Sequence, residues 1–276
     1  MTDSPNGVRA RGGDRWVRYG RGAATGSGLR LFCFPYAGGG AAAFESWTRG
    51  PEPGVDVAAV ELPGRGDRFG ERPCPDIRLL TEDLLAALSP HLDRPYGFYG
   101  HSMGADLAYA LAARIARTPG IRRPLGLFVA ARRAPRSRGP SAARLSDGAL
   151  VQWLRGLGGT PEEVLADPDL LAALLPTLRA DLELAAAPSA RPRDRLAVPV
   201  RAFAGRDDEE APPELMRAWA AETGAGFELT VVPGGHFFLP VSGREVLSGI
   251  AADLRRLSAA EAGCARLEDA GVGVGS

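Results

Sequence analysis

Lysine is absent from this 276-residue chain, and all 33 of its basic residues are arginine. The 33 acidic residues balance them, so the formal net charge is zero. Proteins that bind nucleic acid or anionic membranes usually carry a basic excess. The balanced charge therefore gives no support for either kind of partner.

Cysteine and long apolar runs are also scarce. The three cysteines, Cys33, Cys74 and Cys264, are odd in number and far apart, which favours neither a disulfide framework nor a zinc site. No apolar run reaches the roughly 18 residues of a membrane span, and the first residues lack the apolar stretch of a secretory signal. We expect a cytoplasmic monomer that has no metal and no cofactor.

Short apolar runs alternate with helical patterns through most of the chain. The expected strands are 29–34, 55–62, 96–99, 124–130, 198–204 and 227–232, and the expected helices are 77–92, 106–117, 214–223 and 244–260. Such alternation is typical of a mostly parallel sheet with helices on both faces. The sequence thus predicts one α/β domain over 28–260.

Both ends of the chain differ from this domain. Residues 1–27 are rich in Gly, Arg and small polar residues, and 261–276 end in GVGVGS. We expect both to be disordered tails, except for a short strand at 15–19.

One segment interrupts the alternation. Residues 143–187 show no strand pattern, but leucines recur in them at helical spacing. The segment lies between two expected strands, at the sheet edge where ligands bind in such folds. We interpret it as a helical lid over the site, with a packed, immobile helical subdomain as the alternative.

The motif Gly-His-Ser-Met-Gly at 100–104 falls between an expected strand and an expected helix. A serine on such a tight turn is held above the sheet, and the flanking glycines avoid clashes of a Cβ atom. The motif predicts that Ser102 is a nucleophile. The amide of Met103, at the start of the helix, would face the developing oxyanion.

A serine nucleophile needs a general base, and the chain has only three histidines. His101 is next to the serine but should point away from it, and His91 ends a helix. His236 follows the last expected strand, which returns to the same sheet edge as Ser102. By elimination and position, His236 is the predicted base.

The base needs a carboxylate, and the run Gly-Arg-Asp-Asp at 205–208 follows the strand before it. The chain order Ser, Asp, His is that of the α/β-hydrolase fold. Spacing alone does not choose between Asp207 and Asp208. The glycine-rich loop 34–40 follows the first core strand, where a second oxyanion donor is expected. We assign that donor to the amide of Ala37, with Tyr36 as the alternative.

Several segments together resemble the type II thioesterases that accompany polyketide synthases and nonribosomal peptide synthetases. They are FPYAGGG at 34–40, ELPGRGDR at 61–68, GHSMGA at 100–105, ARRAP at 131–135, GGHFFL at 234–239 and the helical segment 145–184. The resemblance covers about residues 28–258. One departure is the small, Arg-rich stretch 185–199, where the family often has aromatic residues.

The resemblance implies an α/β-hydrolase with a helical lid that removes acyl groups from the phosphopantetheine arm of acyl or peptidyl carrier proteins. It also implies that Asp208, the third residue after a glycine, is the acid. Two alternatives stay open: a product-releasing thioesterase, acyltransferase or cyclase with the same triad, and a non-catalytic binding protein on this fold.

Overall fold

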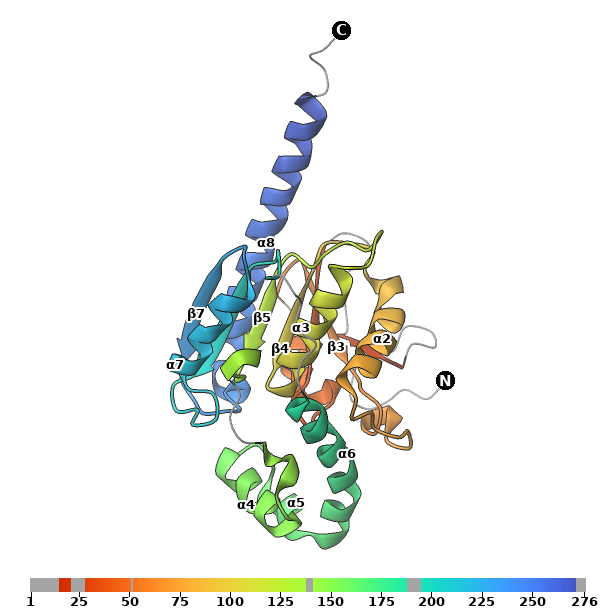
Figure 1. Cartoon of the computed structure of the whole chain (residues 1–276), viewed down its shortest axis with the longest axis vertical. Helices are drawn as coiled ribbons and strands as arrows, with labels where there is room; N and C mark the ends of the chain where they lie inside the picture. The colour runs from red at the N-terminus through yellow and green to blue at the C-terminus, as the bar shows by residue number, and fades with distance from the viewer. Residues whose placement is uncertain (1–14, 21–27, 51, 138–140, 188–194, 272–276) are drawn as a thin grey trace.

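The computed structural model describes residues 15–20, 28–50, 52–137, 141–187 and 195–271 (Figure 1). Seven strands form one sheet in the order β1-β3-β2-β4-β5-β6-β7. Their bounds are β1 Val17–Tyr19, β2 Leu29–Phe34, β3 Val55–Val60, β4 Tyr96–His101, β5 Leu127–Ala130, β6 Val200–Gly205 and β7 Phe227–Val232. β1 pairs antiparallel with β3, and every other neighbouring pair is parallel, which confirms the expected mostly parallel sheet.

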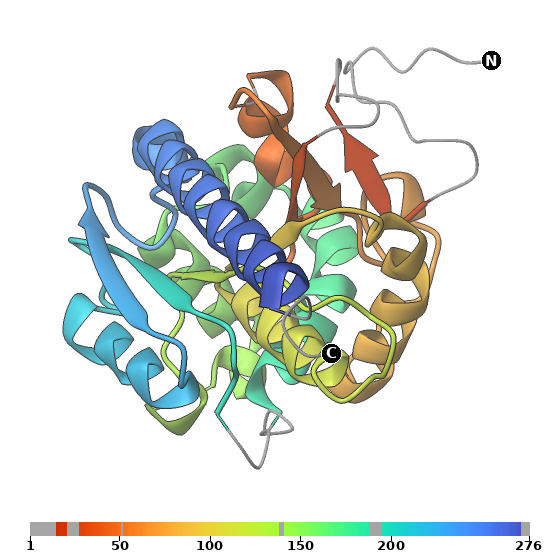
Figure 2. The same ribbon diagram turned by 90° about the horizontal axis from the view of Figure 1, so that it is seen from above.

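Helices cover both faces of the sheet (Figure 2). Those outside the insertion are α1 Glu45–Arg49, α2 Ile77–Leu88, α3 Met103–Ile115, α7 Pro213–Met216 and α8 Leu239–Gly271. Along β2, Phe32 and Phe34 pack with α2 and α3, whereas Leu31 and Cys33 pack with α1 and α8. All four side chains are fully buried, as expected for a parallel strand with a helical layer on each side.

The insertion leaves the sheet after β5, returns before β6 and lies beyond the carboxyl ends of the strands (Figure 1). It contains α4 Asp147–Leu157, α5 Glu162–Ala166 and α6 Pro168–Ala186. Ser146 caps α4 through the Ala149 amide, and Asp167 caps α6 through the Asp169 and Leu170 amides. The three helices share a small core made of Leu150, Val151, Leu154, Leu165, Leu178 and Leu182.

One chain end agrees with the expectation and the other differs from it. The short strand expected at 15–19 is present as β1, Val17–Tyr19, which joins the sheet edge beside β3. The last helix was expected to end at 260, but α8 continues to Gly271 and projects past the sheet (Figure 1). Alanine, leucine, glutamate and arginine, all good helix formers, dominate 258–270, so the expectation of a tail from 261 was wrong there. The rest of the expected tails, 1–14, 21–27 and 272–276, lies outside the described residues.

Candidate active site

The serine turn joins β4 to α3 through a strained backbone. Ser102 has φ +52°, in the left-handed region that a residue with a side chain seldom adopts. A Cβ on Gly100 would lie 2.2 Å from the Gly104 carbonyl oxygen, and one on Gly104 would lie 2.1 Å from the Phe34 carbonyl oxygen. Only glycine fits at either position, because three backbone segments meet there. The turn thereby presents the Ser102 hydroxyl at the carboxyl end of the sheet.

The loops that follow β6 and β7 are tied to each other by backbone contacts. The Arg206 amide donates to the Val232 carbonyl at 2.9 Å, and the Asp207 amide donates to the Gly234 carbonyl at 3.0 Å. Gly205 is also required, since a Cβ there would lie 2.3 Å from the Gly235 oxygen. This close approach brings Asp208 of one loop to His236 of the other.

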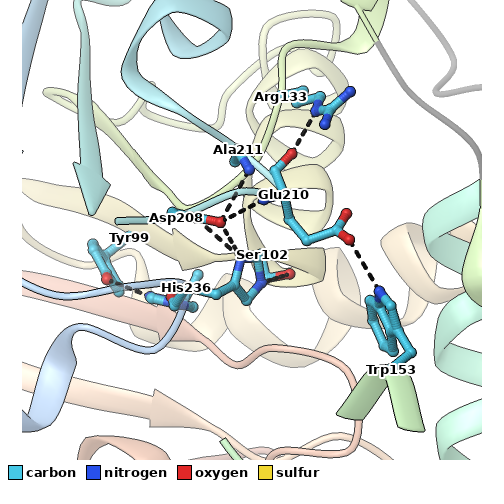
Figure 3. Close-up of polar contacts among 9 residues, drawn as sticks. Tyr99, Ser102, Arg133, Trp153, Asp208, Glu210, Ala211 and His236 are labelled. Atoms are coloured by element: carbon cyan, nitrogen blue, oxygen red, sulfur yellow. Dashed lines mark hydrogen bonds and ion pairs between the residues drawn. The ribbon is translucent and has the colours of Figure 1, made fainter. Parts of the chain in front are cut away.

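The structure brings Ser102, His236 and Asp208 together as a continuous hydrogen-bonded series (Figure 3). His236 Nδ1 is 3.1 Å and 3.2 Å from the two Asp208 carboxylate oxygens, and His236 Nε2 is 3.0 Å from Ser102 Oγ. A carboxylate only accepts hydrogen bonds, so Nδ1 carries the proton and Nε2 is free to accept the hydroxyl proton. Asp207, the alternative acid, is exposed, and the carboxylate bonded to His236 is that of Asp208.

Asp208 is held as a buried carboxylate. Its side chain has an exposed fraction of 0%, and one carboxylate oxygen accepts hydrogen bonds from the Glu210 amide at 2.9 Å and the Ala211 amide at 3.0 Å. Burial pushes the pKa of Asp208 upward, but the His236 ring and the two amides outweigh it and hold that pKa below its usual value. The carboxylate is therefore ionised at neutral pH.

His101 supports the histidine loop, a role that sequence reasoning missed. It is completely buried, and its Nε2 lies 2.8 Å from the His236 carbonyl oxygen, which can only accept. Its Nδ1 accepts from the Tyr99 hydroxyl at 3.1 Å. Burial lowers the pKa of His101 to about 3, with a smaller contribution from the neighbouring His236. The ring is thus neutral and donates to the backbone of the loop rather than to the serine.

The two expected oxyanion donors, the amides of Ala37 and Met103, belong to residues that line one cavity with Ser102 and His236. Among the described residues, neither amide nitrogen has a hydrogen-bond acceptor. Both donors are therefore free for a ligand. Tyr36, the alternative, lines the same cavity, and its carbonyl accepts the Gly39 amide in a tight turn.

The cavity has a volume of about 400 Å³ and lies between the sheet and the insertion. Its outer wall consists of apolar side chains of the insertion: Leu145, Trp153, Leu154, Leu157, Leu178 and Leu182. Arg132, Arg133 and Glu210 also line the cavity, and Arg132 is paired with buried Asp106 at 2.6 Å. An apolar chain attached near Ser102 would find an apolar wall there.

Glu210 joins the insertion to the acid loop (Figure 3). Its carboxylate accepts the Trp153 indole N–H of α4 at 3.0 Å, and its carbonyl accepts the Arg133 Nε–H. Its own amide donates to Asp208, as described above. Sequence reasoning did not find this residue, since nothing in the run Asp-Asp-Glu-Glu separates it from solvated neighbours.

The described part of the chain contains no group of three or more His, Cys, Asp or Glu side chains placed to hold a metal ion. Within the same residues, no helix combines the length and the apolar character that crossing a membrane requires.

A mostly parallel sheet with a strained serine turn after its central strand, and an Asp and a His after the two strands that follow the insertion, defines the α/β-hydrolase class. Comparison with known proteins narrows this class. Residues 29–254 match the family described as "Thioesterase domain". The chain belongs to the thioesterase family.

Some of the proteins that the chain resembles carry names that refer to a biosynthetic pathway. The gramicidin S biosynthesis protein GrsT of Aneurinibacillus migulanus is 36% identical over 82% of this chain and 89% of its own length. The thioesterase PikA5 of Streptomyces venezuelae is 36% identical over 91% of this chain and 88% of its own length. The type II thioesterase BorB from the borrelidin biosynthetic cluster superposes with a TM-score of 0.79, at 38% identity over 89% of this chain and all of that one.

Proposed function

We propose that this chain is an editing thioesterase that hydrolyses acyl groups from the phosphopantetheine arm of a polyketide or peptide carrier protein. The observation that carries the proposal is the 3.0 Å contact from His236 Nε2 to Ser102 Oγ, two residues that line a cavity with an apolar wall. The names of two similar proteins, the type II thioesterase BorB and the thioesterase PikA5, support the choice of a thioester as the substrate.

Acylation begins with attack of Ser102 Oγ on the thioester carbonyl, while His236 Nε2 takes the hydroxyl proton. The ionised Asp208 stabilises the resulting imidazolium. The carbonyl oxygen becomes an oxyanion that accepts from the Ala37 and Met103 amides, and each such donor is worth roughly a factor of 100 to 1,000 in rate. The C–S bond then breaks, and the thiolate leaves and takes up the proton from His236.

Deacylation repeats these steps with water. His236 removes a proton from a water molecule, the hydroxide adds to the acyl-serine carbonyl, and the C–O bond to Ser102 breaks. The proton returns to the serine oxygen and the acid is released. A thiol with a pKa near 8.5 is a far better leaving group than an amine. The departing sulfur therefore needs little assistance from proton donation by His236 during acylation.

The test measures acyl release from a carrier protein by intact mass, with the wild type and with Ser102→Ala. We expect the wild type to remove the acyl mass and the variant to lose on the order of 10⁶ in kcat, as when a serine nucleophile is deleted elsewhere. Ser248→Ala is the matched control, because Ser248 lies on the exposed side of α8. It should keep full activity.

A fluorophosphonate probe, which needs an activated serine, separates the ways in which the proposal can fail. Labelling of Ser102 without release of carrier-bound acyl groups would indicate a serine enzyme that uses another donor or acceptor. Release by Ser102→Ala at the wild-type rate would refute the nucleophile. Absence of both labelling and release would leave the non-catalytic alternative.

A further inference from the structure

A buried ion pair joins the insertion to the turn that carries Ala37. Arg65, in the loop after β3, makes a two-pronged contact with Asp181 of α6, at 2.6 Å and 2.9 Å. Asp181 is 1% exposed and Arg65 is 6% exposed. Replacing a buried pair of this kind with apolar residues is often neutral for stability, so burial alone does not explain its presence.

The same carboxylate has a third partner in the active-site turn. Asp181 Oδ2 accepts the Gly38 amide at 2.7 Å, and Arg65 Nη1 donates to the Gly39 carbonyl at 3.1 Å. A second contact, from the Thr177 hydroxyl to the Gly64 carbonyl at 2.9 Å, joins α6 to the loop that carries Arg65. The pair is therefore bonded directly to the backbone of 38–39.

The backbone of that turn explains what the contact does. The Gly39 amide donates to the Tyr36 carbonyl at 2.9 Å, and Gly38 has φ +76° whereas Ala37 does not have a positive φ. This is a type II turn, which differs from the commoner type I turn by a rotation of its central peptide. That peptide joins Ala37 to Gly38. An acceptor for the Gly38 N–H therefore holds the peptide next to the Ala37 amide in one of two orientations.

We propose that Asp181 is a positioning residue for the reaction: by accepting the Gly38 amide, it orients the turn whose Ala37 amide stabilises the oxyanion. The inference rests on the proposed function for the role of Ala37. Asp181 touches neither Ser102 nor a substrate, and it acts through the backbone of the turn. Arg65 holds the carboxylate in place through two hydrogen bonds.

Two double variants isolate the acceptor. Arg65→Met with Asp181→Asn removes both charges and keeps an amide oxygen for Gly38, whereas Arg65→Met with Asp181→Leu has nearly the same shape and no acceptor. We expect the asparagine version to keep most of the wild-type kcat. The leucine version should lose about 10- to 100-fold in kcat with KM within twofold, less than the loss of a whole donor.

The readout uses an acyl N-acetylcysteamine thioester and a trifluoromethyl ketone, to which Ser102 Oγ adds reversibly so that the ketone oxygen occupies the oxyanion position. In the leucine version, Ki for the ketone should rise by the same factor by which kcat falls. If the role of Asp181 were purely structural, both versions would have a lower melting temperature, but the leucine version would have the same kcat and the same Ki as the asparagine version. Equal kcat and Ki in two folded variants would overturn the proposal.

A remote ion pair provides the control. Arg201 of β6 contacts Asp253 of α8 at 2.8 Å, and neither residue lines the cavity. Arg201→Met with Asp253→Leu should leave kcat and Ki unchanged. Because these readouts need no carrier protein, they stay informative if carrier-bound acyl groups are not the substrate.

If the leucine version does not fold, Arg65→Met with Asp181→Ala replaces it. The alanine removes the acceptor for the Gly38 amide without adding a bulky apolar side chain. We expect kcat to fall about tenfold or more relative to Arg65→Met with Asp181→Asn, and Ki for the ketone to rise by the same factor. Equal kcat and Ki in these two folded variants would refute the proposal.

Discussion

The two halves of the candidate site are built in different ways. Ser102, Asp208 and His236 lie in the turns that follow β4, β6 and β7, and backbone hydrogen bonds join the last two of these loops to each other. The apolar wall that faces them belongs to an insertion with a small core of its own, whose helix α4 is bonded to the sheet domain through the Trp153 contact with Glu210. Chemistry placed on strand ends and selection placed on a helical unit can vary separately, except where Asp181 of α6 bonds to the turn that carries Ala37.

The largest expected effect is at the carboxylate of Asp208, in the half of the site built on the strand ends. Asp208→Asn should lower kcat by about 10⁴-fold for every acyl chain, because the amide cannot hold the His236 tautomer or stabilise the imidazolium. Asp207→Asn is the matched control, as its exposed side chain does not meet the histidine. Steady-state kinetics on acetyl and octanoyl thioesters measure both. The reverse ranking would move the role to Asp207.

Substitutions in the insertion should change the preference for one acyl chain over another rather than the rate of the chemical steps. Leu154→Ala widens the cavity wall, so kcat/KM for octanoyl relative to acetyl thioesters should rise about tenfold, the scale of one or a few methylenes in an apolar pocket. Leu165→Ala is the control, since Leu165 belongs to the same core but not to the cavity lining. Both variants should lose stability, but a changed ratio in Leu165→Ala would contradict this division of roles.

The buried His101 gives the sheet half a dependence on pH. The folded pKa, about 3, lies below the value near 6.5 of the unfolded chain, so the unfolded state binds more protons between these values. Stability should therefore fall as the pH drops from 6.5 towards 3, by up to about 1.4 kcal/mol per pH unit from this group. Urea unfolding at several pH values measures the slope.

The control for this slope is His101→Gln, which keeps a donor for the His236 carbonyl but does not titrate. Its stability should depend less steeply on pH over the same window. An identical slope in the wild type and the variant would show that His101 is not the group responsible.

The smallest effect is expected where the two halves touch. Trp153→Phe removes the indole N–H bonded to Glu210 and keeps an aromatic wall. One such hydrogen bond is worth about 0.5–1.5 kcal/mol, so KM should rise about threefold with little change in kcat. Glu162→Gln, which breaks an exposed contact with Arg155 inside the insertion, should leave KM unchanged. A large loss of kcat in Trp153→Phe would mean that the halves are not independent.

Local patterns were enough to predict the central strands and the insertion. The apolar run 29–34 became β2 residue for residue, and the turn at Ser102 was recognisable because its glycines are required on both sides. The end of α8 was not predictable from pattern, since Gly263 is the type of residue that commonly ends a helix, yet α8 continues past it to Gly271.

Contacts between residues far apart in the chain were out of reach. Arg65 and Asp181 are 116 positions apart, and each looks like an ordinary charged residue in its own segment. The bond from His101 to the carbonyl of His236 spans 135 positions. Because the acceptor is a backbone atom, the identity of residue 236 does not indicate this bond. Such pairs become visible only when the fold brings the segments together.

The bond from Asp181 to Gly38 also bears on engineering by exchange of parts. The insertion starts after one strand and ends before the next, so it looks like a cassette that could be grafted from a relative to change the preferred acyl chain. Yet α6 also holds a turn of the recipient. A graft without a carboxylate at position 181, or into a recipient without an arginine at 65, would transfer the wall of the pocket and leave the turn unsupported. Successful chimeras should therefore exchange the segment around Arg65 together with the insertion.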